Sequence, residues 1–226
     1  MKEMKLVYNI VLLSLGLFIA IYSYGCKETI SDTNVDQNIV TIGNQVWMTK
    51  NLDVSTFRNG DPIFEARTMD EWYRAGDDKR PAWCYYENDP ANGTKYGKLY
   101  NWYAVNDPRG LVPNGWHVPS DEEWTVLTNY LGGAENAGAK MKSKTGWFQE
   151  GNGTNSSGFS GLPGGERDGW GTFYEIGNYG SWWSSTEVIN TYTAWSRYLR
   201  YNVGNAFRDS IPNYKNFGLS VRCLKD

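Results

Sequence analysis

Hydrophobic and polar residues alternate in two short runs that flank Gly43 and Asn44. Alternation with a period of two is typical of strands that bury one face, and a Gly-Asn pair favours a tight connection between strands. The pattern therefore predicts a β-hairpin within residues 38–52. The motif Arg-Asn-Gly-Asp-Pro-Ile at 58–63 predicts a further turn.

Two later segments carry the signals of helix starts. Thr68 and Glu71 stand three residues apart, as do Ser120 and Glu123, and this spacing is that of a capping box. We therefore expect a short helix over 68–76 and a second one from Ser120. In the second segment, apolar residues follow at helical spacing and two glycines end the pattern: Trp124, Leu127, Leu131, Gly132 and Gly133.

The remaining pattern favours short strands. An aromatic run surrounds Cys84, and glycines recur every few residues from 158 to 187 with aromatic residues between them. Two more strands are expected around Gly204, and a last one at 217–224. Residues 95–107 fit a helix or a strand, and we favour a helix. With no second domain boundary visible, the pattern predicts one α+β domain over 38–226.

The first 25 residues have the pattern of an export signal. Lys2 and Lys5 precede an apolar-rich stretch at 6–24, and Gly25 stands directly before Cys26. We predict a lipoprotein signal peptide at 1–25, lipidation of Cys26 and a flexible tether at 26–37. The alternative is an uncleaved membrane anchor, because the apolar stretch is just long enough to span a bilayer. Either reading places the domain in the cell envelope, and lipid anchoring favours the outer membrane.

Composition changes the picture in two ways. The formal net charge is −3 without a block of like charge, which argues against a nucleic-acid partner. The chain also carries 11 Trp and 16 Tyr, and these side chains suit binding surfaces as well as cores. Our candidates for ligand binding are Trp170, Tyr174, Trp182 and Trp183. The adjacent pair Trp182 and Trp183 has the competing interpretation of core residues, one on each face of a strand.

The cysteines and the single histidine have structural interpretations. With Cys26 assigned to lipid, Cys84 and Cys223 form an even pair in an oxidising compartment, which predicts a disulfide; two buried free thiols are the alternative. His117 has no nearby set of metal ligands and no sequence partner for catalysis, so we expect a packed or hydrogen-bonded side chain.

Acidic and amide side chains give two further hypotheses. A glycosidase needs two carboxylates across a cleft, and Glu166, Asp168 and Glu175 are close to one another in sequence. A turn and a hairpin are expected at these positions, so we interpret the three residues as solvated charges. We expect no cofactor. The alternative is a calcium ion held by some of the oxygen-bearing side chains of one turn: Glu87, Asn88, Asp89 and Asn92.

Six motifs in order carry a family resemblance: TIGNQVWMTKNLDV, YGKLYNWYAV, PNGWHVPSDEEWTVL, GFSGLPGGER, WWSST and GLSVRCLKD. Over residues 38–226 the chain resembles the Fibrobacter succinogenes major paralogous domain family. The segment HVPSDEEW followed by GSWW is also similar to the sulfatase-modifying-factor group. That similarity implies a C-type-lectin-like fold, with two or three short helices packed on short, twisted antiparallel sheets with long loops.

The resemblance also bears on function. Many family members carry a cysteine where this chain has Val112, so Cys84 and Cys223 are left to pair with each other. The cysteine motif of the sulfatase-modifying enzymes is absent, and no catalytic residue is carried over. The hypothesis is a non-catalytic lipoprotein module that binds carbohydrate. The alternatives are an adhesion or structural protein with a protein partner at the cell surface, and, last, a sulfatase-modifying-factor-like enzyme.

Overall fold

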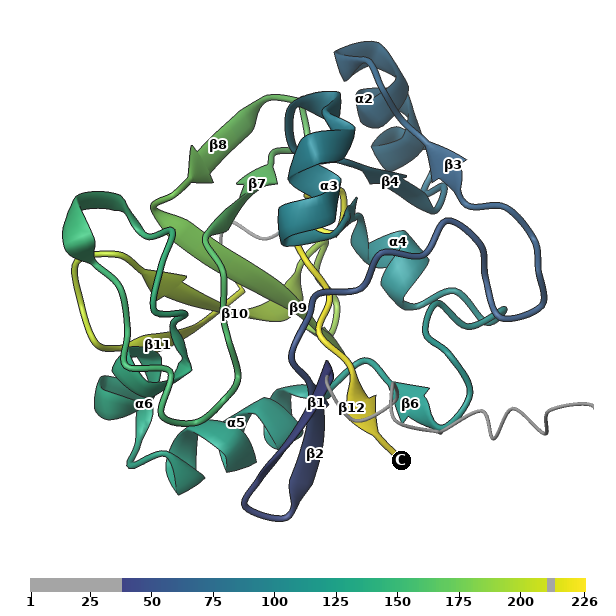
Figure 1. The fold of residues 1–226 in the computed structure, drawn as a ribbon. Coiled ribbons are helices and arrows are strands. Elements are labelled where there is room, and N and C mark those ends of the chain that lie inside the picture. Colours follow the sequence, from purple (N-terminus) through teal and green to yellow (C-terminus); the bar gives the residue numbers. More distant parts are fainter. Residues whose placement is uncertain (1–37, 211–213) are drawn as a thin grey trace, which may run out of the picture. The chain divides into compact units, whose positions relative to one another are not determined.

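The computed structural model describes residues 38–210 and 214–226, so the expected signal peptide, Cys26 and the tether lie outside the described residues. The described chain forms five α-helices with three small sheets (Figure 1). The helices are α2 (Met69–Asp77), α3 (Pro90–Tyr96), α4 (Trp102–Val105), α5 (Asp121–Tyr130) and α6 (Ala134–Met141). The α+β class expected from the sequence is confirmed, with more helices than the two or three expected.

The first sheet joins the two ends of the domain. Its strands, in the order β1-β2-β12-β6, are β1 (Ile39–Ile42), β2 (Gln45–Met48), β12 (Leu224–Lys225) and β6 (Trp116–His117). The hairpin of β1 and β2 turns at Gly43, as the sequence predicts. Leu224 of β12 lies opposite both Trp47 and His117, so the last strand fills the space between the first hairpin and β6.

The second sheet is the largest. Its order is β11-β10-β9-β7-β8, from β7 (Gly164–Arg167), β8 (Phe173–Ile176), β9 (Tyr179–Glu187), β10 (Ala194–Arg200) and β11 (Ala206–Asp209). All neighbours are antiparallel except β7 and β9. Helices α5 and α6 pack against β9, β10 and β11 (Figure 1). The Gly-rich half of the chain therefore forms the short strands that its pattern predicts.

The third sheet has three strands, β3 (Phe64–Glu65), β4 (Ala82–Cys84) and β5 (Leu99–Tyr100), with β3 parallel to β4. Short 3-10 helices, η2 (Tyr86–Asn88) and η3 (Phe148–Glu150), complete the regular structure. The ambiguous segment 95–107 contains both candidates, because strand β5 leads directly into helix α4. Asn101 makes this change possible: its side-chain oxygen caps α4 by accepting from the backbone N–H of Ala104.

Both predicted capping boxes are present. The Thr68 and Ser120 side chains accept from the backbone N–H of Glu71 and Glu123, and each glutamate side chain accepts in return from the backbone N–H of its cap residue. Helix α6 was not expected. It begins after Gly133, which has a φ of 89° and provides no side-chain cap, so the usual sequence signal for a helix start is missing.

Adjacent tryptophans on β9 connect two hydrophobic clusters. Trp182 packs in the cluster that contains Trp47, Trp124 and Phe159, whereas Trp183 packs in the cluster that contains Tyr100. Neighbouring residues of a strand point to opposite faces, and the sheet is covered on both sides here. Both rings are fully buried. Their assignment as ligand-binding residues is therefore wrong, and the competing interpretation as core residues holds.

The expected disulfide between Cys84 and Cys223 is also wrong. Both are free and buried, and each packs in a different hydrophobic cluster: Cys84 beside Trp72, and Cys223 with Tyr100. Burial raises the pKa of each thiol to about 12, which keeps both protonated. Within residues 38–210 and 214–226, no helix is long and apolar enough to cross a membrane.

Three cations inside the domain are bound by backbone carbonyl groups. Arg167 donates to the carbonyls of residues 66, 68 and 171 at 2.7–3.0 Å, and Lys142 donates to those of residues 200, 201 and 203 at 3.0–3.1 Å. Arg222 donates to the carbonyls of residues 48 and 159. None of the three forms an ion pair with a carboxylate among the described residues. Their hydrogen bonds hold loops against the sheets, and no carboxylate among the described residues neutralises their charge.

Candidate functional site

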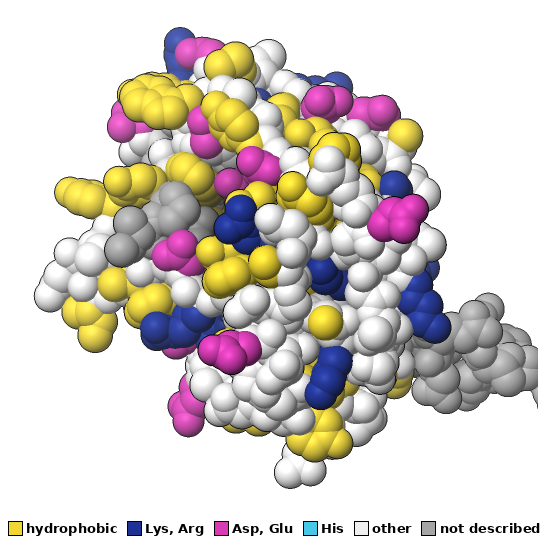
Figure 2. Space-filling model, turned by 90° about the vertical axis from the view of Figure 1, so that its left-hand side faces the viewer, with side chains coloured by type: hydrophobic (Ala, Val, Ile, Leu, Met, Phe, Trp, Pro, Cys, Tyr) yellow, Lys and Arg dark blue, Asp and Glu magenta, His cyan; other side chains and the backbone are white. Residues whose placement is uncertain are grey.

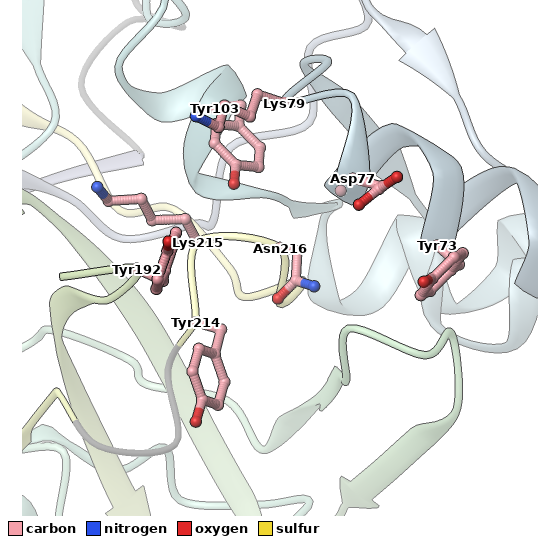
Figure 3. A pocket seen from close by; sticks show the side chains of 9 residues that line it. Tyr73, Asp77, Lys79, Tyr103, Tyr192, Tyr214, Lys215 and Asn216 are labelled. Atoms are coloured by element: carbon pink, nitrogen blue, oxygen red, sulfur yellow. The ribbon is translucent and has the colours of Figure 1, made fainter.

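An aromatic cavity of about 340 Å³, which we call the tyrosine cleft, opens where α2 meets the segment that leads to the C-terminus. Figure 3 shows Asn216 between two groups of side chains, with Tyr73 and Asp77 on one side and Tyr192 and Tyr214 on the other. The cleft is lined by Tyr73, Gly76, Asp77, Lys79, Tyr103, Tyr192, Tyr214, Lys215 and Asn216. Four of these nine residues are tyrosines, so aromatic rings form a large part of its wall.

The amphipathic pattern of α2 explains the near wall of the tyrosine cleft. Trp72 and Ala75 are buried, which turns Tyr73 and Asp77 outward. Gly76 allows Asn216, which forms the floor of the cleft, to lie close to the helix backbone. A Cβ atom at position 76 would lie 2.6 Å from Cβ of Asn216. Any larger residue at 76 would push Asn216 out of its place. The helix therefore positions the tyrosine ring and its glycine admits the asparagine.

A flat aromatic platform adjoins the cleft. The rings of Tyr73 and Trp170 stack with centroids 5.3 Å apart and an interplanar angle of 9°. Trp170 stands in a tight turn in which Asp168 Oδ1 accepts from the backbone N–H of Trp170 at 2.9 Å and of Thr172 at 2.8 Å. The exposed fraction of Trp170 is 68%, so its ring is accessible at the surface. We call Tyr73 and Trp170 together the aromatic platform.

The polar groups of the cleft supply both donors and acceptors. Asn216 Oδ1 is buried and has no hydrogen-bond partner among the described residues. Lys215 Nζ forms an ion pair with Glu187 and lies 5.1 Å from the ring centroid of Trp102. Burial raises the pKa of Tyr103, and the charge of Asp77 adds to the effect, so its hydroxyl stays a proton donor. The set can bind a ligand that carries several hydroxyl groups.

Tyr174 and the acidic residues lie elsewhere. Tyr174 is exposed on β8, opposite Glu166 on β7, and does not line the tyrosine cleft. Glu166 and Glu175 instead line a separate cavity of about 260 Å³ with Tyr179, Ser181, Ser196, Tyr198 and Asp209. Burial raises the pKa of Glu166 to about 7, helped by the charges of Glu175 and Asp168. The interpretation of Glu166 as a solvated charge is therefore wrong.

The surface on one side of the domain has mixed chemistry. Figure 2 shows hydrophobic and acidic side chains gathered in the upper half of this face, with lysine and arginine side chains dispersed among them. This face therefore carries no broad basic surface of the kind that follows a nucleic-acid backbone.

In the turn considered for calcium, three of the four side chains make hydrogen bonds to nearby backbone groups. Asp89 caps α3 by accepting from the backbone N–H of Ala91 at 2.8 Å, and Asn92 donates to the carbonyl of Tyr86 at 3.0 Å. Asn88 donates to the carbonyl of Arg67 at 2.6 Å, which leaves its own side-chain oxygen buried without a partner. No group of three His, Cys, Asp or Glu side chains is placed for a metal in the described residues. Calcium binding stays the alternative to the expectation of no cofactor.

His117 has the structural role expected for it. Its Nδ1 lies 2.7 Å from Asp226 Oδ1, and its Nε2 lies 2.9 Å from Glu123 Oε1. Partial burial lowers the pKa of the ring, but the two carboxylate partners outweigh it, and the net shift is upward. The histidine thereby connects the last residue of the chain to the capping box of α5, and the prediction of a hydrogen-bonded residue is confirmed.

None of the nine residues that line the tyrosine cleft was among the sequence-based candidates. Tyr73 had a usable signal, since Trp72 and Ala75 at helical spacing predict that the two residues between them, Tyr73 and Arg74, point outward. Tyr192 and Tyr214 had none. They meet through the isolated bridge between Thr193 and Tyr214, which is a long-range pairing that no local pattern announces.

Comparison with known proteins gives one match. The model of a family described as the Fibrobacter succinogenes major domain matches residues 40–225. No curated protein and no solved structure matches the chain.

Proposed function

The chain belongs to the Fibrobacter succinogenes major domain family, and we propose that its domain is a non-catalytic module that binds carbohydrate in the tyrosine cleft. The aromatic platform is the observation that carries the proposal. A stacked pair of rings beside an aromatic cavity offers a flat apolar surface to the C–H face of a sugar. The polar groups around it are placed for the sugar hydroxyls.

The floor of the cleft supports a ligand rich in hydroxyl groups. Among the described residues, Asn216 Oδ1 has no hydrogen-bond donor, and an unsatisfied buried acceptor costs about 1–3 kcal/mol. Because this oxygen is closed to solvent, the Asn216 side chain must turn toward the cleft before a ligand hydroxyl can donate to it. Among the described residues, Asp77 is the one carboxylate that lines the cleft, whereas glycoside hydrolysis normally uses two. This supports binding rather than cleavage.

The test is a screen of the soluble domain, residues 27–226, against neutral oligosaccharides and polysaccharides, followed by intrinsic tryptophan fluorescence. We expect saturable binding that Trp170→Ala weakens by about tenfold. Tyr130→Ala is the matched control, because Tyr130 is an exposed aromatic residue on α5 outside the cleft. Equal losses in both variants, or no binding by the folded domain across the panel, would overturn the proposal.

A protein partner is the second candidate, and one loop favours it. Ile189 and Tyr192, between β9 and β10, have exposed fractions of 81% and 77%. Exposed apolar side chains at a loop tip are typical of protein contacts. In this case cross-linking at the surface of intact cells would trap a protein through this loop, and Tyr192→Ala would reduce the yield while sugars would not compete.

We further propose that lipid at Cys26 holds the domain on the outer membrane. The support is the basic and apolar pattern of residues 1–25 with Gly25 before Cys26. Metabolic labelling of the full chain with a fatty acid tests it. Label should enter the wild-type chain and fail to enter Cys26→Ser, and the labelled protein should fractionate with the outer membrane. Label in Cys26→Ser would contradict the assignment.

A further inference from the structure

A second cavity, of about 530 Å³, is larger than the tyrosine cleft and shares no lining residue with it. It lies between the segment that follows β2, the helix α3 and the loop that precedes β7. We call it the lysine cleft. The residues that carry the argument are Thr49, Lys50, Asn51, Thr94, Lys95 and Ser160.

The rim of the lysine cleft carries uncompensated positive charge. Lys50 and Lys95 are both exposed, and neither forms an ion pair in the part of the chain that the structure describes. Lys95 Nζ instead lies 4.7 Å from the ring centroid of Tyr96. Of the described residues that line the cleft, Asp53 alone is acidic, and it pairs with the buried Lys98. The acid therefore does not neutralise the rim.

A third cation lies behind the floor. Arg222 is fully buried, and its Nη2 and Nε donate to Asn51 Oδ1 at 2.8 and 3.1 Å. Burial lowers the pKa of Arg222 to about 9, which leaves it charged at neutral pH. A buried charge without a counter-ion projects its field further than a solvated one, because little water screens it. Asn51 lies between this charge and the cavity.

The lining completes a polar pocket. The Asn51 amide nitrogen donates to the carbonyl of Tyr96 at 2.8 Å, which fixes the side chain in the floor. Thr49, Thr94 and Ser160 also line the cavity. Hydroxyls and amines together are the groups that bind the ring oxygens and charged substituents of sugars.

We propose that the lysine cleft binds the carboxylate or sulfate group of an anionic saccharide, with Lys50 and Lys95 contacting the anion. The cavity is large enough for a sugar unit. This site goes beyond the proposed function, and it stands or falls separately because the two cavities have no residue in common.

The test measures binding of oligogalacturonate and of a sulfated galactose oligomer to the soluble domain, by calorimetry and by amide chemical shifts. A neutral galactose oligomer and inorganic sulfate are the comparison ligands. We expect the charged oligomers to bind more tightly than either comparison ligand, to shift the amides of residues 49–53 and 93–97, and to weaken as salt increases. Lys50→Gln/Lys95→Gln should lower the affinity about tenfold.

The control variant also removes two positive charges, at positions outside the lysine cleft. Arg74→Gln/Lys225→Gln lies outside the cleft at exposed positions and should leave the affinity unchanged. Trp170→Ala should also leave it unchanged, whereas loss of binding in Trp170→Ala would assign the anion to the tyrosine cleft. The proposal is overturned if the neutral oligomer binds equally well, if the control double variant loses as much, or if inorganic sulfate accounts for the whole effect.

Discussion

The indole ring of Trp170 lies parallel to the phenol ring of Tyr73, although the two residues come from a turn and a helix nearly a hundred positions apart. Each ring covers one face of the other, so removal of Tyr73 would leave Trp170 without its support. We expect Tyr73→Ala and Trp170→Ala to weaken carbohydrate binding by similar factors of about tenfold, and the double variant to lose little more. A double-mutant cycle by fluorescence titration measures this, and fully additive losses would contradict the coupling.

Asp121 connects α5 to the largest sheet. Its carboxylate accepts from the buried Arg197 at 2.6 Å and from the exposed Arg208 at 2.8 Å. Asp121→Asn should destabilise the domain by about 2–4 kcal/mol, because the guanidinium of Arg197 would stay buried without its counter-ion.

Arg208→Gln is the matched control for that loss. It removes the exposed partner of the same carboxylate, and should cost less than about 1 kcal/mol. Urea denaturation of both variants makes the comparison. If both variants lost the same free energy of unfolding, the buried ion pair of Asp121 and Arg197 would contribute no more than the exposed one.

Glu166 should make stability depend on pH. Its folded pKa is raised from 4.5 to about 7, so the folded state binds this proton more tightly than the unfolded chain does. Its contribution is therefore neutral below about pH 4.5, becomes unfavourable as the pH rises to about 7, and stays constant above that. Glu166→Gln removes the charge and should be more stable than the wild type by about 1–3 kcal/mol near pH 8, with little difference near pH 4.5.

Urea denaturation at the two pH values measures this difference. Ser181 donates to Glu166 Oε2 at 3.4 Å, and a glutamine oxygen can accept the same bond, so the substitution isolates the charge. A Glu166→Gln variant that is no more stable at high pH would contradict the buried-acid description.

The two cysteines of the domain should behave as protected thiols. Cys84 and Cys223 are buried and free, so a thiol reagent should react with neither in the native state and with both after denaturation. A reducing agent should leave the melting temperature unchanged. Cysteines that stay unreactive in denaturant without reductant would instead reveal a disulfide.

Local sequence signals predicted local structure well. The capping boxes at Thr68 and Ser120 and the turn at Gly43 each satisfy backbone groups within a few residues, so their geometry follows from the residues themselves. The split of Trp182 and Trp183 between two clusters follows equally from the alternation of a strand.

Features that depend on distant partners were missed. Helix α6 begins at Gly133 without a side-chain cap and is held by its packing on β11. Glu166 sits in a predicted hairpin, and only its place in the interior of the five-stranded sheet makes it a buried acid. Cys84 and Cys223 lie in different hydrophobic clusters because of the same long-range arrangement of strands. The number of cysteines in the sequence gives no information on that arrangement.

The last nine residues connect all three sheets. Gly218 bridges to Arg167, Leu219 to Tyr100 and Ser220 to Trp182, before Leu224 joins the first hairpin to β6. These pairings join segments that lie far apart in the sequence, so no sheet of the domain reaches its final pairing until residues 218–224 are in place. Folding must then wait for contacts between the two ends of the sequence, which is slow.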